Sequence, residues 1–421
     1  MAGILQKEGV MIMSSSNFRF TAISDVHITQ FHSGEEVFSN ALKVLTEQFP
    51  PSDLYVFAGD IVYQLDSWQD SVCRNLYGSH YDFVNAQLAQ YLGDTPRLIA
   101  TGNHEFPQNN NDETMNREAF EIWLSKFGQP ACEHRVVQGY HFIKTAVMNW
   151  RMDQVPEYET WAMEEIRKAL EEDTEKPVFL ITHDAMPNTV MRAGDGHRSF
   201  SEEFRNYLVT CPRVIHISGH IHTHVLDDGA IYQEGFTSVS LPCCAVGQLS
   251  IRVPNYKPVG GFSQSCIFEV EGRRILVHRI DHTLGKEVGE PWVIDLDETE
   301  QGIYRYGAQA RLTAPCPEFT PEARLVVKQE DGQTVLGIPQ SFLPGKLLAL
   351  YYEIRVRNAE GREVICRKVH TDFYNLSHGK EMAGILEFRL GELAEGEYTV
   401  EVRPMNCYDR SGAPVCDTFQ V

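Results

Sequence analysis

The feature that most constrains the fold is a series of five short polar motifs, each placed directly after a run of apolar residues. The motifs are Asp25-Val26-His27, Gly59-Asp60, Gly102-Asn103-His104-Glu105, His183-Asp184 and Gly219-His220-Ile221-His222. The apolar runs before them have the length of buried strands. Because the carboxyl ends of strands border the crevice in which open α/β sheets bind ligands, we expect all five motifs to converge on one site.

Short apolar runs alternate with amphipathic helical patterns from residue 18 to about residue 294, which is typical of helices packed on sheets. Strands are expected at 18–24, 54–58, 97–100, 142–147, 178–182 and 214–218. Helical spacing joins Phe38, Ala41, Leu42, Leu45 and Phe49, and also Ala162, Ile166, Ala169 and Leu170. Further strand-like runs at 238–241, 250–253, 265–270, 275–280 and 292–296 predict a second sheet.

A polar stretch at 295–301, followed by a proline-containing segment to residue 321, predicts a domain boundary. Beyond it, β-type runs predict a small all-β sandwich, with strands at 324–329, 334–338, 348–357, 363–370, 385–390, 398–403 and 415–421. Tyr398, Val400 and Val402 share one face, which we expect in the core. The stretch 396–406 resembles a late strand of a fibronectin type III or immunoglobulin-like module.

The net charge of −21 lies almost entirely in the first part of the chain. From residue 301 onward, 14 Lys and Arg face 16 Asp and Glu, a balance of −2 that leaves −19 for residues 1–300. Nucleic acid duplexes and membrane surfaces are anionic and would be repelled by such a body. A small-molecule substrate is therefore the better expectation.

The start of the chain lacks the basic and apolar pattern of a secretory signal, and no stretch approaches the ~20 apolar residues that span a bilayer. The ten cysteines include no CxxC pair and form no dense framework. Reduced thiols and a cytoplasmic location are therefore expected.

The motifs supply carboxylate, imidazole and amide donors without thiolate, a set that suits divalent manganese, iron, zinc or nickel rather than structural zinc. Seven candidate ligands are more than one ion needs, which predicts two ions. Two ions about 3.5 to 4 Å apart clamp a phosphoryl group and lower the pKa of a bound water. The pattern thus favours phosphoester hydrolysis by attack of metal-bound hydroxide.

In this order the motifs resemble the calcineurin-like metallophosphoesterase family, over roughly residues 18–296. The resemblance implies a two-sheet αββα sandwich, followed here by the small β-sandwich. It also implies a first metal ion held by Asp25, His27 and His222, a second held by Asn103, His183 and His220, and bridging by Asp60. His104 is implied as the catalytic residue, which protonates the leaving oxygen or holds the phosphate.

The chain departs from the protein phosphatases of this family after the Gly-Asp motif. Those enzymes carry an Asp and an Arg where Tyr63 and Gln64 stand here, which argues against a Ser/Thr protein phosphatase. The departure leaves Asp66 and Glu105 as alternative partners of His104.

Specificity is expected from the long segments between the motifs, because loops at strand ends carry binding residues. Segments 61–95 and 185–200 are expected to cover the site. In the second of these, Arg192 and Arg198 are candidates for contacting a substrate phosphate. Trp150 and Arg151 are candidates for lining the cleft, with the core as the alternative for Trp150.

We therefore divide the chain into a tail (1–17), a metallophosphoesterase domain (18–300) and a β-sandwich domain of unknown role (301–421). The favoured hypothesis is a hydrolase of small phosphoesters, with phosphodiesters such as cyclic nucleotides slightly preferred over phosphomonoesters such as nucleotides. The alternative of another class is a metal-binding scaffold whose sandwich docks a protein partner. The complete ligand set and His104 favour the enzyme. Because no motif lies beyond His222, a chain ended near residue 300 is expected to stay active.

Overall fold

The computed structural model describes residues 17–29, 34–63, 71–108, 112–193, 199–245, 262–340, 342 and 349–421. The predicted tail (apart from Asn17) and the predicted strand at 250–253 lie outside these residues, as do Gln64, Asp66 and Arg198.

Among the described residues, a seven-stranded sheet has the order β12-β11-β10-β1-β2-β3, with β13 paired to β11. Its strands are β1 (Phe18–Ile23), β2 (Leu54–Phe57), β3 (Arg97–Ile99), β10 (Gln264–Glu271), β11 (Arg274–Asp281), β12 (Lys286–Glu287) and β13 (Trp292–Asp295). β1, β2 and β3 run parallel, so their carboxyl ends meet at one edge of the sheet.

A second sheet, six-stranded within the described part of the chain, has the order β4-β5-β6-β7-β9-β8. Its strands are β4 (Glu133–Val137), β5 (Tyr140–Lys144), β6 (Val178–Ile181), β7 (Val214–Ser218), β8 (Ile231–Gln233) and β9 (Thr237–Ser240). β5, β6, β7 and β9 are parallel neighbours. A second sheet is thus present, but its predicted composition was wrong. Of the described runs expected to form it, only 238–241 belongs to it, because 265–270, 275–280 and 292–296 lie in the first sheet.

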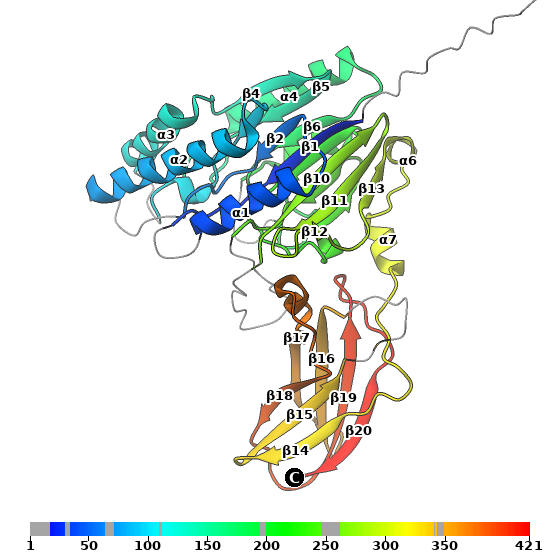
Figure 1. The fold of residues 1–421 in the computed structure, drawn as a ribbon. Coiled ribbons are helices and arrows are strands. Elements are labelled where there is room, and N and C mark those ends of the chain that lie inside the picture. Colours follow the sequence, from blue (N-terminus) through cyan, green and yellow to red (C-terminus); the bar gives the residue numbers. More distant parts are fainter. Residues whose placement is uncertain are drawn as a thin grey trace, which may run out of the picture.

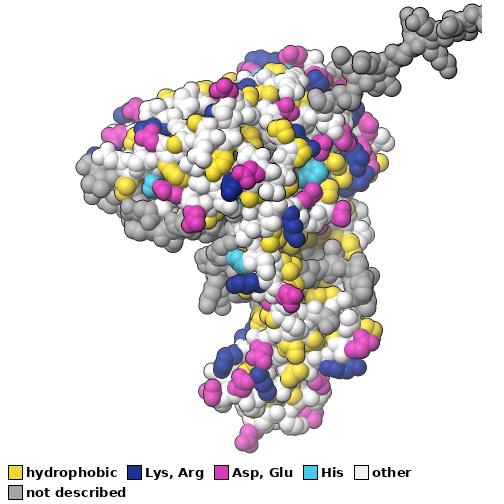
Figure 2. Space-filling view, in the orientation of Figure 1, with side chains coloured by type: hydrophobic (Ala, Val, Ile, Leu, Met, Phe, Trp, Pro, Cys, Tyr) yellow, Lys and Arg dark blue, Asp and Glu magenta, His cyan; other side chains and the backbone are white. Residues whose placement is uncertain are grey.

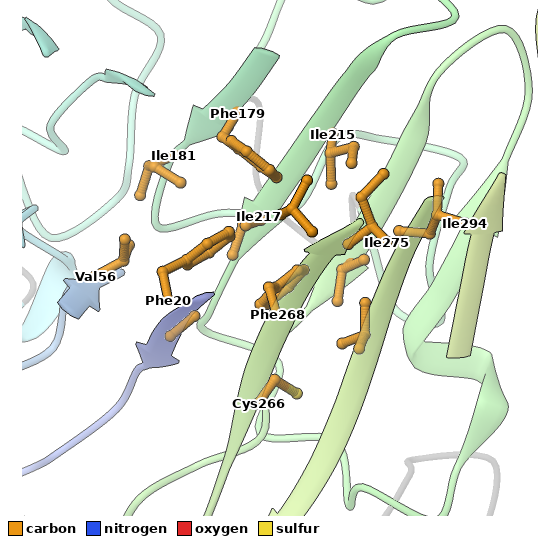
Figure 3. Packing of buried hydrophobic residues seen from close by; sticks show 14 of the residues in the cluster. Phe20, Val56, Phe179, Ile181, Ile215, Ile217, Cys266, Phe268, Ile275 and Ile294 are labelled. Atoms are coloured by element: carbon orange, nitrogen blue, oxygen red, sulfur yellow. The ribbon is translucent and has the colours of Figure 1, made fainter. Parts of the chain in front are cut away.

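One apolar core fills the space between the two sheets, as Figure 3 shows for Phe20, Phe179 and Phe268. The ring of Phe20 stacks on that of Phe268 at a centroid distance of 4.6 Å and meets that of Phe179 edge-on at 4.8 Å. Each such ring contributes roughly 1.5 to 3 kcal/mol when it leaves water. This packing fixes the two sheets face to face, and with them the strand ends that carry the motifs.

Helices cover the outer faces of both sheets, which completes the predicted αββα sandwich (Figure 1). α1 (Gly34–Glu47), α2 (Ser71–Leu92) and α3 (Glu113–Phe127) pack on the first sheet, and α4 (Pro156–Glu172) and α5 (Glu202–Val209) on the second. The ends of α3 follow from its sequence: Asp112 accepts the N–H groups of Thr114 and Met115, and Gly128 ends the helix at φ 67°.

Segment 61–95 was predicted to cover the site, and its α2 part does not do so. Its larger part is α2, whose buried residues Tyr77, Tyr81 and Leu88 pack with Phe57 on the outer face of the first sheet. The prediction was wrong for α2 because the aromatic residues of this segment recur at helical spacing and belong to the core.

The predicted boundary region contains two short helices, α6 (Leu296–Glu300) and α7 (Ala308–Thr313). Arg311 of α7 donates hydrogen bonds to the backbone oxygens of Ile231 and Thr189, and Tyr306 packs against the core between the sheets. Residues just beyond 300 therefore pack on the α/β part, and a domain division at residue 300 stays a prediction.

The C-terminal part is all-β, as predicted, and forms a separate body in Figure 1. Among the described residues it holds a three-stranded sheet, β14-β15-β18, and a four-stranded sheet, β17-β16-β19-β20. The strands are β14 (Val326–Glu330), β15 (Gln333–Pro339), β16 (Tyr351–Asn358), β17 (Glu363–His370), β18 (Ile385–Gly391), β19 (Glu397–Met405) and β20 (Val415–Gln420).

Each predicted β-run of the C-terminal part corresponds to one of these strands, and Tyr398, Val400 and Val402 are buried between the sheets as expected. One element was not foreseen, the 3-10 helix η3 (Phe373–His378) between β17 and β18. The resemblance to a fibronectin type III module stays a prediction.

On the face of the molecule shown in Figure 2, acidic and basic side chains are interspersed. No helix within the described residues has the length and apolar character that a bilayer crossing requires.

Candidate metal centre

The five motifs follow β1, β2, β3, β6 and β7, and the loops that carry them are hydrogen-bonded to one another. Asp25 donates its backbone N–H to Gly59 O at 3.1 Å, and His27 donates to Asp60 O at 3.1 Å. Gly219 donates to His183 O at 2.8 Å. The predicted convergence of the motifs is therefore present, and backbone contacts hold it.

Left-handed backbone conformations are concentrated at these loops. Positive φ angles occur at Asp25 (55°), His27 (50°), Asp60 (52°), His220 (66°) and His222 (56°). Such a conformation costs a residue with a side chain roughly 1 to 2 kcal/mol. It turns the chain sharply at the strand end, so that both residues of an Asp-x-His or His-x-His pair face the same space. Strain of this kind tends to gather at functional sites.

A first group of donor atoms comes from Asp25, His27, Asp60 and His222, which lie within 4.8 Å of one another. His222 Nε2 lies 2.8 Å from Asp25 Oδ1 and 3.1 Å from His27 Nε2. All four side chains are buried.

A second group comes from Asp60, His183 and His220, again within 4.8 Å. His183 Nε2 lies 3.2 Å from Asp60 Oδ2 and 3.2 Å from Asn103 Oδ1, which adds the amide to the group. His183 Nδ1 donates to Ala58 O at 2.7 Å, so in the neutral ring the lone pair lies on Nε2 and faces the group. Asp60 belongs to both groups.

These separations suit metal coordination. Ligand atoms about 2.0 to 2.1 Å from one ion lie roughly 3 Å apart when they occupy adjacent positions. Two pairs of donor atoms have about this separation. The Nε2 atoms of His27 and His222 lie 3.1 Å apart, and His183 Nε2 lies 3.2 Å from Asp60 Oδ2. Two buried carboxylates among imidazoles also favour a cation, because burial without one is costly. The cluster could hold divalent transition-metal ions.

His104 lies beside the two groups, in the short 3-10 helix η1 (Asn103–Glu105). Its Nε2 is 3.8 Å from Asp60 Oδ2, and its backbone N–H donates to Asp60 Oδ1 at 2.8 Å. The rings of Tyr63 and Trp150 flank it at centroid distances of 4.9 and 4.8 Å. Of the two alternatives for Trp150, the structure therefore favours the cleft.

Residues 18–224 match the family model for calcineurin-like phosphoesterases. The segment is a calcineurin-like phosphoesterase domain. The match agrees with the family that the motif order predicts, and the donor cluster lies at the strand ends of this segment.

Several solved structures are similar to the chain. A purple acid phosphatase from yellow lupin (Lupinus luteus) seeds has 14% identity and a TM-score of 0.47, covering 67% of this chain and 54% of its own. A 5'-nucleotidase precursor from Thermus thermophilus has 14% identity and a TM-score of 0.30, with 70% and 59% covered. Vacuolar Protein Sorting 29 from Cryptosporidium parvum has 11% identity and a TM-score of 0.32, with 66% and 98% covered.

This chain thus spans about half the length of the lupin phosphatase (54%). No match was found among curated proteins.

Glu105 has a role in the phosphoesterase domain that differs from the one considered in the sequence analysis. Its carboxylate accepts the backbone N–H groups of Asp60, Ile61, Val62 and Gly102 at 2.6 to 3.1 Å. Burial, together with the neighbouring Asp60 carboxylate, raises the pKa of Glu105 to about 8. Glu105 therefore ties together the loops after β2 and β3, whereas the other proposed partner of His104, Asp66, lies outside the described residues.

Cys243, shortly after β9, was missed by the motif search. Its sulfur lies within 4.8 Å of donor nitrogens of His27 and His222, and the thiol donates to Asp25 O at 3.1 Å. A thiol that the motifs did not indicate therefore lies beside the first donor group. The signal available in the sequence was its place just after the apolar run at 238–241, at another strand end.

The imidazoles of the phosphoesterase domain differ in their pKa. Burial lowers the pKa of His27 to about 3, with His222 as the next cause, and burial likewise lowers that of His104 to about 3. Burial alone would lower the pKa of His183 too, but the carboxylate of Asp60 raises it to about 9. The pKa of Asp25 is lowered, because the nearby histidines outweigh the opposing effect of burial.

The two candidate phosphate-binding arginines are not both described. Arg192 lies in a turn next to Val190 and Ala193, which pack with Ala185 and Ile221. Arg198 lies outside the described residues. Substrate binding by either arginine stays a prediction.

Proposed function

We propose that the chain is a dinuclear metal-dependent hydrolase of small phosphoesters. The observation that carries the proposal is the position of Asp60, shared by two groups of donor atoms. Asp25, His27 and His222 would hold one ion, Asn103, His183 and His220 the other, and Asp60 would bridge them. Two divalent transition-metal ions bound here would polarise a phosphoryl group and activate water for attack on phosphorus.

The chain itself contributes His104 next to this cluster. Tyr63 and Trp150 pack against its ring and restrict its orientation. From this position His104 can donate a proton to the leaving oxygen or hold a phosphoryl oxygen. Both roles stay open.

A pocket beside His183 would receive the organic part of the substrate. Its walls include Thr145, Met152, Tyr158 and Phe200. Its lining residues in the described part of the chain include carboxylates (Asp153, Glu159 and Asp184) and neither Lys nor Arg. Because this pocket adjoins the proposed metal ligand His183, its carboxylates would lie near the phosphoryl group and disfavour the second negative charge that a phosphomonoester carries there. A phosphodiester, which carries one charge, is the preferred substrate class, and cyclic nucleotides belong to it.

Turnover of paired substrates tests the proposal. The purified protein, loaded in turn with manganese, iron, zinc or nickel, is assayed with bis-p-nitrophenyl phosphate, p-nitrophenyl phosphate and a cyclic-nucleotide panel. We expect metal-dependent hydrolysis with the diester ahead. Faster monoester hydrolysis would favour a phosphomonoesterase acting on nucleotides. Metal binding without hydrolysis of any ester would favour the scaffold hypothesis.

The cytoplasmic location and a protein partner for the β-sandwich also stay predictions. Cell fractionation tests the first, and co-purification with the sandwich surface intact or altered tests the second.

A further inference from the structure

The loop that carries His222 is contacted by the C-terminal β-sandwich. His224, two residues further on, places its Nε2 2.9 Å from Ser377 Oγ in η3. Both side chains are buried, with exposed fractions of 2% each. The β-sandwich is therefore hydrogen-bonded to a residue only two positions after His222, a proposed metal ligand.

The direction of this hydrogen bond follows from the other nitrogen of the ring. Leu226 donates its backbone N–H to His224 Nδ1 at 3.1 Å, so Nδ1 carries a lone pair. The neutral ring with its proton on Nε2 donates to Ser377, and Gln264 Nε2, whose two hydrogens point to Ser377 and Asp281, lies 3.0 Å from the same nitrogen. Asp227 donates its N–H to His224 O at 2.9 Å and closes a turn around the ring.

Ser377 also belongs to a buried network from the first sheet. Gln264 of β10 donates from Nε2 to Ser377 Oγ at 3.1 Å and to Asp281 Oδ2 at 2.9 Å. Its Oε1 accepts the N–H of Val225 at 3.2 Å. The Ser377 hydroxyl thus joins the His222 loop, β10 and β11, and its loss would leave buried polar groups unsatisfied.

Apolar contacts reinforce the same junction. The His224 ring meets the ring of Phe373 edge-on at 5.1 Å. Leu226 packs in a cluster with Phe373, Met405 and Cys407 of the C-terminal part. Beyond it, Tyr408 donates its hydroxyl to Asp228 O at 3.1 Å. The sandwich therefore touches the loop at several points between residues 224 and 228.

We infer that the β-sandwich is a structural part of the metal centre, and that Ser377 is a positioning residue which holds the His222 loop in its metal-binding conformation. This deepens the proposed function and rests on it. His222 has a left-handed φ of 56°, a conformation that persists only where the surroundings impose it. The junction with the sandwich supplies that constraint. On this inference a chain ended near residue 300 would lose metal affinity, whereas the sequence analysis expects such a chain to stay active.

Metal titration of full-length variants tests this inference. Ser377→Ala removes the hydroxyl, and Ser377→Thr keeps it. Tyr408→Phe removes a second contact of the same loop. Thr334→Val serves as the matched control, because the Thr334 hydroxyl is equally buried in the sandwich but bonds Gln329 of β14. Metal-free proteins, shown to be folded by circular dichroism, are titrated with Co²⁺ and followed by visible absorption.

We expect Ser377→Ala to weaken one of two Co²⁺ sites about tenfold, the lower end of the effect typical of residues that orient ligands. The other site should be retained, Ser377→Thr should restore binding, and Tyr408→Phe should act in the same direction. Thr334→Val should leave both affinities unchanged even if its melting temperature falls.

Unchanged affinity in folded Ser377→Ala or, should that variant not fold, in Tyr408→Phe overturns the inference. So does equal weakening of both sites in Ser377→Ala and Thr334→Val, which would indicate general destabilisation. A wild-type chain that binds two ions but hydrolyses no ester contradicts the proposed function alone. A wild-type chain that binds no second ion contradicts both.

Discussion

Asp60 donates its backbone N–H to Glu105 Oε2 at 3.0 Å, so a buried carboxylate holds the residue that we propose as the bridging ligand. The same carboxylate accepts three further N–H groups from the loops after β2 and β3. The two loops therefore depend on one side chain for their relative position.

Replacing Glu105 with Gln is expected to destabilise the protein and to reduce turnover, because an NH₂ group would face backbone donors. Each buried backbone donor left without an acceptor corresponds to about 1 to 3 kcal/mol. Chemical denaturation measures the loss, with Glu118→Gln on the exposed face of α3 as the control. Equal stability of the two variants would contradict the role assigned to Glu105.

Lys144 predicts a pH dependence of stability. Its side chain is fully buried, it donates to Ile99 O and Pro130 O at 2.9 Å, and burial lowers its pKa to about 8. The unfolded chain keeps this proton up to about pH 10.4. Between these values the unfolded state binds more protons, so the contribution of Lys144 to stability rises with pH.

The stability difference between the wild type and Lys144→Met should accordingly shift by about 1 to 2 kcal/mol in favour of the wild type between pH 7 and pH 9.5. Urea unfolding of both proteins across this range measures the shift. A difference that stays constant with pH would show that the lysine is charged in the folded state throughout.

His104→Asn distinguishes the two roles left open for this residue. Turnover should fall by something like the ~10² to 10⁴ typical of a positioned general acid, with metal content near normal. If His104 is the acid, an alkyl ester should suffer more than its nitrophenyl counterpart, since nitrophenolate departs without a proton. A uniform deficit would indicate phosphate binding. Loss of a metal ion, or full activity toward both esters, would refute both roles.

Much of this architecture could be predicted from the sequence because the signals are local. Apolar runs of strand length and helical spacing such as Phe38, Ala41 and Leu45 indicate burial directly. Most of the described strands, together with α1 and α4, occur where these patterns stand, whereas β4, β8 and β12 were not predicted. The convergence of the motifs followed from a general rule on parallel strand ends. Asp25 and His222 meet for this reason, although 197 residues separate them.

What the sequence did not indicate depends on contacts between distant segments. Cys243 reaches the cluster only because β9 lies next to β7, a pairing that no local pattern announces. No sequence pattern distinguishes Ser377 from other serines in turns. Its role depends on the contact of η3 with His224. The left-handed backbone at Asp60 is likewise imposed by neighbouring loops, since aspartate alone does not prefer it strongly.

The sharing of Asp60 between two ions is tested most directly by counting the ions bound per chain. Metal-free wild type titrated with manganese should saturate at about two ions. Asp60→Ala should weaken both sites and abolish hydrolysis, whereas Asp25→Ala should mainly weaken one site. Saturation of the wild type at a single ion, or two undisturbed sites in Asp60→Ala, would contradict the account.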